Sequence, residues 1–458
     1  MEKPTLLLLT LILGSVAYFL GRNKSTALAN SDASKLHSLP LYYGSYTALW
    51  FLLPSLSVIL LWILLEGTVL SHLLISSLPA DVSGLPAEKL GLFMNEVKNV
   101  AGGAATGSSD IVSSAVKEYT RLASVSERVL LFATLGAGLL GGMKGYADIS
   151  PALRARNGVE YCIQIFLILC SSLAVLTTVG IVFSVLLESL RFFHLVPVTE
   201  FLLGTSWSPQ TALRTDQVAS QGAFGAVPLF VGTLLISLIA LSVAVPVGLL
   251  SAIYLSEYAG TRFRAMAKPL LEVLAGIPTV VYGFFAALVV APFIRDMGGR
   301  AGLDVSSESA IAAGLVMGIM IIPFVSSLAD DFINAVPQSL RDGAYALGAT
   351  QSETILHVVI PAALPGIVGG VLLAASRAIG ETMIVVMASG LTANLTINPF
   401  EAVTTVTTQI VTLLVGDQEF DSAKTLAAFA LGLVLFLATL VLNIISLHIV
   451  RKYREQYE

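Results

Sequence analysis

The chain alternates long apolar runs with short polar segments, and this pattern predicts an all-α polytopic membrane protein. Crossing about 30 Å of hydrocarbon takes about 20 helical residues, so an apolar run of that length is a candidate span. Pro246, Pro278 and Pro323 lie inside three of the runs and predict kinks, which membrane bundles tolerate. The six runs of the second part of the chain are Cys162–Leu187, Val227–Leu255, Val273–Ile294, Ala310–Leu328, Ala362–Leu391 and Thr425–Ile449.

The first 158 residues differ from this pattern and predict an N-terminal membrane extension. Thr5–Leu20 and Tyr42–Leu65 are apolar, whereas Val129–Met143 is a marginal, Gly-rich run of 15 residues. A polar segment, 79–128, separates the second run from the third, and its stretch 102–109 predicts a flexible interruption. We therefore expect residues 1–158 to hold two or three spans and residues 159–458 to form a second domain with six.

The number of spans in the extension decides which side of the membrane its loops face. With three spans, Arg22, Lys24 and Lys35 lie inside and 79–128 lies outside; with two, these sides exchange. Basic residues gather in cytoplasmic loops, so three spans are favoured, nine in total. The first run also resembles a cleavable signal peptide, with Ser25–Ala29 as a cleavage-like site, but Arg22 follows its long apolar core at once. An uncleaved anchor is the favoured interpretation.

The basic residues of the other loops predict the orientation of the second domain. Ten of them lie on one side of the six runs and five on the other, so the first side is expected to be cytoplasmic, with the C-terminus. The loop after Ala310–Leu328 lies on this side, and its first residues, Asp330 and Asp331, are expected to be solvated. The ten are Lys144, Arg154, Arg156, Arg262, Arg264, Lys268, Arg341, Arg451, Lys452 and Arg454; the five are Arg191, Arg214, Arg295, Arg300 and Lys424.

One further uncharged segment, Ala402–Gly416, is 15 residues long and rich in Thr. Its apolar residues fall on one helical stripe. If it crossed the membrane, the basic C-terminus would lie outside. We therefore expect an amphipathic helix that lies outside the cytoplasm or is half inserted, rather than a seventh span in this domain.

Composition agrees with a membrane protein and leaves little chemistry for an enzyme. Hydrophobic residues make up 55% of the chain and charged residues 12%, with a mean hydropathy of +0.85. Cys162 and Cys170 lie in one apolar run, which favours free thiols. The sequence contains no P-loop, His-Glu-x-x-His, Cys-x-x-Cys or Gly-x-Ser-x-Gly motif, and its five histidines are scattered. A carrier is favoured over an enzyme, and no cofactor, metal or nucleic-acid partner is expected.

The polar loop 329–361 predicts a docking site for a partner on the cytoplasmic face. Gly343 and Gly348 permit close backbone approach and a tight turn, and Pro361 and Pro365 are expected to bound the restart of a helix. The two halves of the loop would form a helix-turn-helix knob, with a solvated connector as the open alternative. The predicted short helices are Ala344–Leu347 and Ser352–Val359.

The run Ala362–Leu391 alone carries charges, Arg377 and Glu381. Counting ~1.5 Å per residue from Pro365 places Arg377 about 18 Å in, near the middle of the membrane. At i and i+4 the two side chains share one helical face and can pair, which lowers the insertion cost of each. A buried salt bridge and a transport site are the two interpretations of such a pair.

The loop carries a resemblance to a known family. Asp342, Gly343, Ala344 and Gly348, followed at the same spacing by Val358, Ile360 and Pro361, resemble the Glu-Ala-Ala…Gly…Ile-x-Leu-Pro loop of ATP-binding-cassette importer permeases. Asp stands for Glu and Gly for the first Ala. Four further segments, in order, resemble the PstC-type branch of phosphate importers: Phe201–Pro209, Phe224–Thr233, Leu274–Gly283 and Ser376–Met383.

The resemblance implies a six-helix permease core with the type I importer fold, in a bacterial inner membrane. It also implies a second related permease, a pair of ATPase subunits docked on the loop, and an extracytoplasmic phosphate-binding protein. In this interpretation Arg377 offers a forked donor to phosphate in transit, Glu381 competes for the guanidinium, and Thr382 lies beside them. The alternatives are a permease for another oxyanion and, from a different class, an ion-coupled secondary transporter that uses the same two charges.

Overall fold

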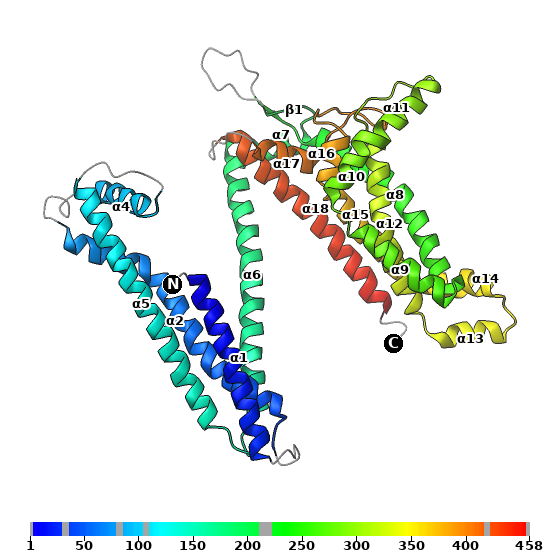
Figure 1. Cartoon of the computed structure of the whole chain (residues 1–458). Coiled ribbons are helices and arrows are strands. Elements are labelled where there is room, and N and C mark those ends of the chain that lie inside the picture. The colour runs from blue at the N-terminus through cyan, green and yellow to red at the C-terminus, as the bar shows by residue number, and fades with distance from the viewer. Residues whose placement is uncertain are drawn as a thin grey trace, which may run out of the picture. The chain divides into compact units, whose positions relative to one another are not determined.

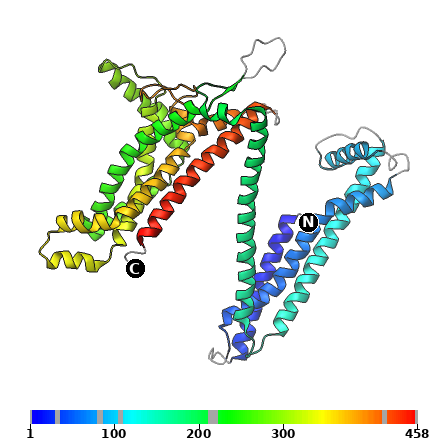
Figure 2. The same cartoon turned by 180° about the vertical axis from the view of Figure 1, so that it is seen from behind.

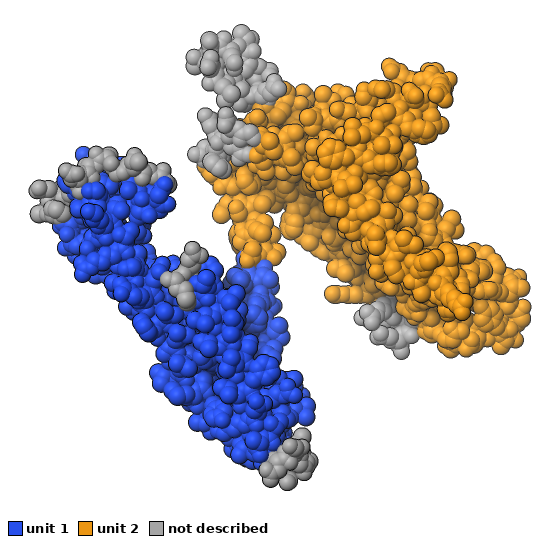
Figure 3. Space-filling model, in the orientation of Figure 1, with its two compact units in different colours: residues 1–176 blue, residues 177–458 orange. Residues whose placement is uncertain are grey.

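The computed structural model describes residues 3–29, 36–78, 86–103, 110–209, 222–415 and 422–454. It divides into two compact units, residues 1–176 and 177–458 (Figure 3). Both units are built almost wholly from helices (Figure 1). Within the described residues, nine helices are long and apolar enough to cross a membrane, which confirms the all-α polytopic prediction and agrees with the favoured total.

The first unit is built around α2 (Pro40–Ser77), against which α1 (Lys3–Leu28) and α5 (Asp110–Ala147) both pack. A Cβ added at Gly141 of α5 would lie 2.0 Å from the Trp50 carbonyl oxygen, so a glycine is required at this contact. The Gly-rich run expected to be a marginal span is therefore the packing face of a longer helix, because small residues let membrane helices approach closely. The unit also contains α4 (Ala87–Ala101) and the start of α6 (Ala155–Leu195).

The polar segment of the extension is more helical than the sequence predicts. α4 lies inside it, and the first turns of α5 cover its last residues. Met94 and Val97 of α4 pack with Leu74 of α2 and Val112 of α5 in one small apolar cluster. Most of the predicted flexible interruption at 102–109 lies outside the described residues.

Helix α6 contains the division between the two units, at residues 176 and 177. Nearly all of its residues from 160 to 181 are exposed, although they are apolar. The predicted domain boundary at 158 lies in the first turn of the same helix, and the ranges 1–158 and 159–458 stay a prediction.

The second unit contains the other membrane helices and short elements at their ends (Figures 1 and 2). α12 is the most buried of the candidate spans and packs along α8, where Gly314 meets Ile239 and Gly318 meets Ala240. The elements are α7 (Val198–Leu203), β1 (Trp207–Ser208), β2 (Ala223–Phe224), α8 (Val227–Ile253), η2 (Tyr254–Tyr258), α9 (Thr261–Ala275), α10 (Thr279–Phe285), η3 (Ala286–Val290), α11 (Ala291–Arg300), α12 (Ala310–Asn334), α13 (Gln338–Ala346), α14 (Gln351–Thr354), η4 (Ile355–Val359), α15 (Ile360–Ile379), α16 (Met383–Ala388), α17 (Val406–Leu414) and α18 (Ala423–Arg454). The two strands pair antiparallel, with Trp207 opposite Phe224.

The predicted span Val273–Ile294 is wrong at its start. α9 ends at Ala275 and a new helix begins at Thr279, with Pro278 as its N-cap residue rather than a kink. The residue before a proline avoids the helical region, so the Gly276-Ile277-Pro278 sequence separates the two helices. Pro246 and Pro323 do lie inside helices, as predicted.

Candidate functional site

The loop predicted to dock a partner, called the docking loop below, forms two short helices joined by a tight turn. α13 begins at Gln338, six residues earlier than predicted, and α14 begins at Gln351. Gly348 has a φ of +87°, the left-handed region that a side chain disfavours. Leu347, beside it, is 91% exposed. The loop therefore presents one large apolar side chain at its tip.

The predicted docking residues do not all lie on the surface. Asp342, Gly343 and Gly348 are exposed, and the Asp342 carboxylate accepts a hydrogen bond from Gln338 at 3.1 Å. The other four predicted residues lie in α13 or in the helix that follows the turn. Ala344, Val358 and Ile360 are half-buried, and Pro361 is exposed.

Pro361 and Pro365 do not bound the restart of the helix, contrary to the prediction, because both lie inside it. The helix begins at Gln351 and runs without a break to Ile379. A proline inside a helix lacks its own N–H and clashes with a carbonyl one turn earlier. The five-residue π-turn η4 widens the helix just before Pro361, and a matching π-turn, η3, precedes Pro292.

The loop is anchored by residues that the sequence does not single out. Arg341 forms an ion pair with Glu257 of η2, and their side chains are only 12% and 9% exposed. Arg341 also donates to the Ile333 carbonyl at 2.7 Å, and Gln351 donates to the Glu257 carbonyl at 2.8 Å. The sequence carries only one hint of this pair, an acidic residue two positions after the apolar run Val227–Leu255.

Asp330 is buried and ion-paired, so the expectation that it is solvated is wrong. Its carboxylate lies 2.5 Å from the Lys268 ammonium and 3.3 Å from the Arg264 guanidinium, both on α9. These contacts join α9 to the end of α12. The amphipathic α9 folds back onto the bundle, and this brings its basic residues to Asp330.

Arg377 lies near the end of α15 with an exposed side chain, and its Cζ is 5.5 Å from the ring centroid of Phe324. Phe324 lies fourteen residues after Ala310 in the 25-residue α12, about 21 Å along its axis. Within the described residues, no ion pair joins Arg377 to a carboxylate. Its guanidinium lies over an aromatic ring, and none of its five N–H donors forms a hydrogen bond with another described residue.

The expected single span Ala362–Leu391 is wrong, because the helix ends at Ile379. Gly380 follows as the C-cap residue and α16 begins at Met383, so Glu381 and Thr382 lie in a break rather than one turn along from Arg377. The Glu381 carboxylate accepts a hydrogen bond from the Met383 N–H at 3.2 Å. The Glu381 carbonyl accepts one from Thr407 of α17 at 2.8 Å.

The segment Ala402–Gly416 contains the nine-residue α17, too short to span a membrane; Gly416 lies outside the described residues. Several of its polar side chains are buried, Thr407, Thr408 and Gln409 among them, and its placement outside the cytoplasm or half inserted stays a prediction. Gln409, only 6% exposed, accepts a hydrogen bond from the Trp207 indole at 3.0 Å and donates to the Leu391 carbonyl at 2.8 Å. A cavity of about 370 Å³ opens beside Trp207 and Gln409. Their elements, β1 and α17, lie at the end of the second unit opposite α13 and α14 (Figure 1).

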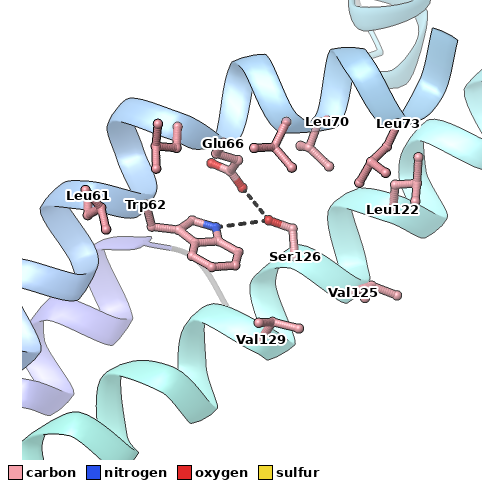
Figure 4. A pocket seen from close by; sticks show the side chains of 11 residues that line it. Leu61, Trp62, Glu66, Leu70, Leu73, Leu122, Val125, Ser126 and Val129 are labelled. Carbon is pink, nitrogen blue, oxygen red and sulfur yellow. Dashed lines mark hydrogen bonds between the residues drawn. The ribbon is translucent and has the colours of Figure 1, made fainter. Parts of the chain in front are cut away.

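A second cavity, of about 340 Å³, lies between α2 and α5 in the extension (Figure 4). Its wall is apolar except for a small polar group. Ser126 donates to Glu66 at 2.9 Å and accepts from the Trp62 indole at 3.1 Å. The Lys3 ammonium lies 2.5 Å from the Glu66 carboxylate. The carboxylate of Glu66, in the apolar helix α2, is thus both ion-paired and hydrogen-bonded.

Comparisons with known proteins agree with this architecture. Residues 7–177 match the family model described as "Phosphate ATP-binding cassette transporter", and residues 244–455 match "Binding-protein-dependent transport system inner membrane component". The solved structure of the MetNI methionine ABC transporter in an inward-facing conformation covers 50% of this chain and 94% of that chain, at 17% identity and a TM-score of 0.37, which is too low to inform the fold.

Several permeases match this chain at higher sequence identity than that solved structure does. The probable ABC transporter permease YqgH of Bacillus subtilis is 33% identical over 283 residues, which cover 60% of this chain and 87% of that protein. The phosphate transport system permease PstC 1 of Mycobacterium tuberculosis is 35% identical over 277 residues, 55% of this chain and 81% of that protein. PstC of Mesorhizobium japonicum is 34% identical over 264 residues, 54% and 76% respectively. This multi-pass membrane protein therefore belongs to the family of binding-protein-dependent transport system inner membrane components, as a PstC-type permease.

Proposed function

We propose that the chain is a transmembrane permease subunit of an ATP-driven importer for inorganic phosphate. The observation that carries the proposal is the exposed guanidinium of Arg377, which has no carboxylate partner among the described residues and lies beside Phe324, near the middle of α12. A charge in an apolar helix is costly and marks a substrate path by default. Relatives named phosphate transport system permeases supply the substrate class.

Arg377, Glu381 and Thr382 form the proposed substrate pathway. The planar guanidinium can give two parallel hydrogen bonds to a phosphate oxyanion, which an ammonium cannot. Glu381 lies in the break between α15 and α16, where its carboxylate accepts a hydrogen bond from the Met383 N–H. Once the anion leaves, the carboxylate can exchange this partner for the guanidinium. Competition of this kind keeps the anion from being captured permanently. The Thr382 hydroxyl, half-buried in the same break, donates to the Gly380 carbonyl at a long 3.4 Å and can turn its single O–H to the anion instead.

The loop 342–361 is the proposed docking site for the ATPase subunits. Leu347 exposes a large apolar side chain to solvent, and a partner with an apolar cleft would bury it. The unbroken helix from Gln351 to Ile379 joins this tip directly to Arg377. A second related permease would complete the path, and an extracytoplasmic phosphate-binding protein would deliver the anion to the opposite end.

The docking loop and the C-terminus are proposed to lie in the cytoplasm of a bacterial cell. The excess of basic residues on this side supports the orientation. The α13–α14 loop and the end of α18 lie at the same end of the second unit in both views (Figures 1 and 2), which fits a common side.

The deciding experiment measures uptake of labelled phosphate into proteoliposomes that hold the chain with its co-expressed permease and ATPase partners, together with the binding protein. Uptake that needs ATP and is not competed by phosphonate, sulfate or molybdate supports the proposal. Stronger competition by one of those anions would assign the permease to that oxyanion instead. Uptake by the chain alone, driven by an ion gradient, would contradict it and favour a secondary transporter.

A further inference from the structure

Four separate elements meet at the ion pair between Glu257 and Arg341. Glu257 lies in the π-turn η2 that follows α8, and Arg341 lies in α13. The second nitrogen of the guanidinium reaches the Ile333 carbonyl, near the end of α12. Gln351, the first residue of α14, donates to the backbone of Glu257. Both sides of the docking loop are therefore tied to the bundle at one point.

The chemistry of this junction requires an arginine. One nitrogen of the fork binds the carboxylate while the other binds a carbonyl on a different helix, so the guanidinium holds two elements at a fixed angle. A lysine ammonium keeps the charge but lacks the rigid fork. Because both charges are almost fully buried, removing either one leaves its partner without compensation. A solvated connector would gain nothing from burying such a pair.

The junction also connects the loop to the substrate path by a second route. Besides the continuous helix that carries Arg377, the loop is joined through Ile333 to α12, which carries Phe324. α12 packs closely on α8, where Gly248 meets Val325. α8, α12 and α15 are thus all fixed to the loop at their cytoplasmic ends.

We propose that Glu257 and Arg341 are positioning residues that lock the docking loop to α8 and α12, so that movement of the loop displaces the helices of the path as one rigid body. The proposal rests on the proposed function, in which the ATPase moves this loop. Without the lock, ATPase closure moves α13 while α8 and α12 stay behind. ATP is then hydrolysed without transport.

The test measures phosphate uptake and ATP hydrolysis in the same proteoliposomes of the full complex and compares their ratio between variants. Glu257→Gln and Arg341→Lys are expected to keep binding-protein-stimulated hydrolysis within about twofold of wild type and to lower uptake per ATP about tenfold or more. The paired reversal, Glu257→Arg with Arg341→Glu, is expected to recover part of the ratio. The control is Lys268→Met, which breaks an ion pair between α9 and Asp330 of α12 at the same end. It leaves α13, α14 and the Glu257–Arg341 pair untouched and should leave the ratio unchanged.

An unchanged ratio in both single variants would overturn the lock while leaving the permease function intact. A wild-type complex that hydrolyses ATP without any uptake would instead overturn the proposed function itself. If a single variant does not assemble with the ATPase in a pull-down, the paired reversal decides. Assembly with a recovered ratio supports the lock, and assembly with the ratio still lost contradicts it.

Discussion

The guanidinium carbon of Arg377 lies 5.5 Å from the centroid of the Phe324 ring, across the contact between α15 and α12. The ring can stabilise the cation without consuming its hydrogen-bond donors, because the attraction comes from the face of the π-system. A carboxylate in the same place would occupy the fork. The arrangement keeps a charge in an apolar bundle and leaves its N–H groups available to an anion.

Substitution of Arg377 separates transport from assembly. Arg377→Gln removes the forked cation and is expected to abolish phosphate uptake, while the level of the complex in the membrane stays near wild type. Phe324→Leu keeps the apolar volume and removes the π-face, which contributes about 0.5–2 kcal/mol, so we expect a few-fold to thirtyfold weaker uptake. Labelled-phosphate uptake, normalised to complex on immunoblots, checks both. Wild-type uptake in Arg377→Gln would rule out the site.

The docking loop offers a matched pair of glycines. Gly348 has a φ of +87°, so Gly348→Ala forces a side chain into a left-handed backbone at a cost of about 1–2 kcal/mol. Gly343 lies in α13 with open space around it, so Gly343→Ala is expected to stabilise the helix slightly. A pull-down of the ATPase should be weakened only by the first change. Equal retention by both variants would mean that the turn does not shape the docking surface.

A second pair of glycines tests the packing of the extension. A Cβ at Gly141 would overlap the Trp50 carbonyl oxygen, whereas one at Gly136, on the same helix, meets nothing within 4 Å. Gly141→Ala should therefore separate α5 from α2 and lower the melting temperature of the purified complex by several degrees. Gly136→Ala should leave it unchanged or slightly higher. Comparable melting of both variants would contradict the close helix contact.

The ion pair between Lys3 and Glu66 predicts a rescue. Lys3→Met leaves the Glu66 carboxylate in an apolar wall with hydrogen bonds but no counter-charge, and we expect a clear loss of stability. Lys3→Met combined with Glu66→Gln removes both charges and keeps the Ser126 hydrogen bond, so the double variant should recover most of the loss. Thermal melting in detergent measures both. A double variant less stable than Lys3→Met would show that the carboxylate itself is required.

The membrane class and most of the spans follow from the sequence alone, because the hydrocarbon layer acts on each apolar run locally. Arg377 stands out for the same reason, as a charge in a run that should have none. The family resemblance rests on the spacing of Asp342, Gly348 and Pro361, which the sequence carries directly. The docking role and the substrate role remain predictions that the experiments above decide.

Only the tertiary structure decided where helices end and which charges meet. A long apolar run does not reveal that the chain breaks at Gly276–Pro278 or after Ile379, since apolar residues lie on both sides of each break. Nor does it reveal that the helix continues through Pro361 after widening into the π-turn η4, because this depends on how neighbouring turns share hydrogen bonds. The Glu257–Arg341 pair joins residues 84 positions apart, and no local pattern links them. The hydrocarbon layer favours each apolar run as a helix independently of the others. The positions of helix breaks and ion pairs depend instead on the neighbouring helices that pack around them.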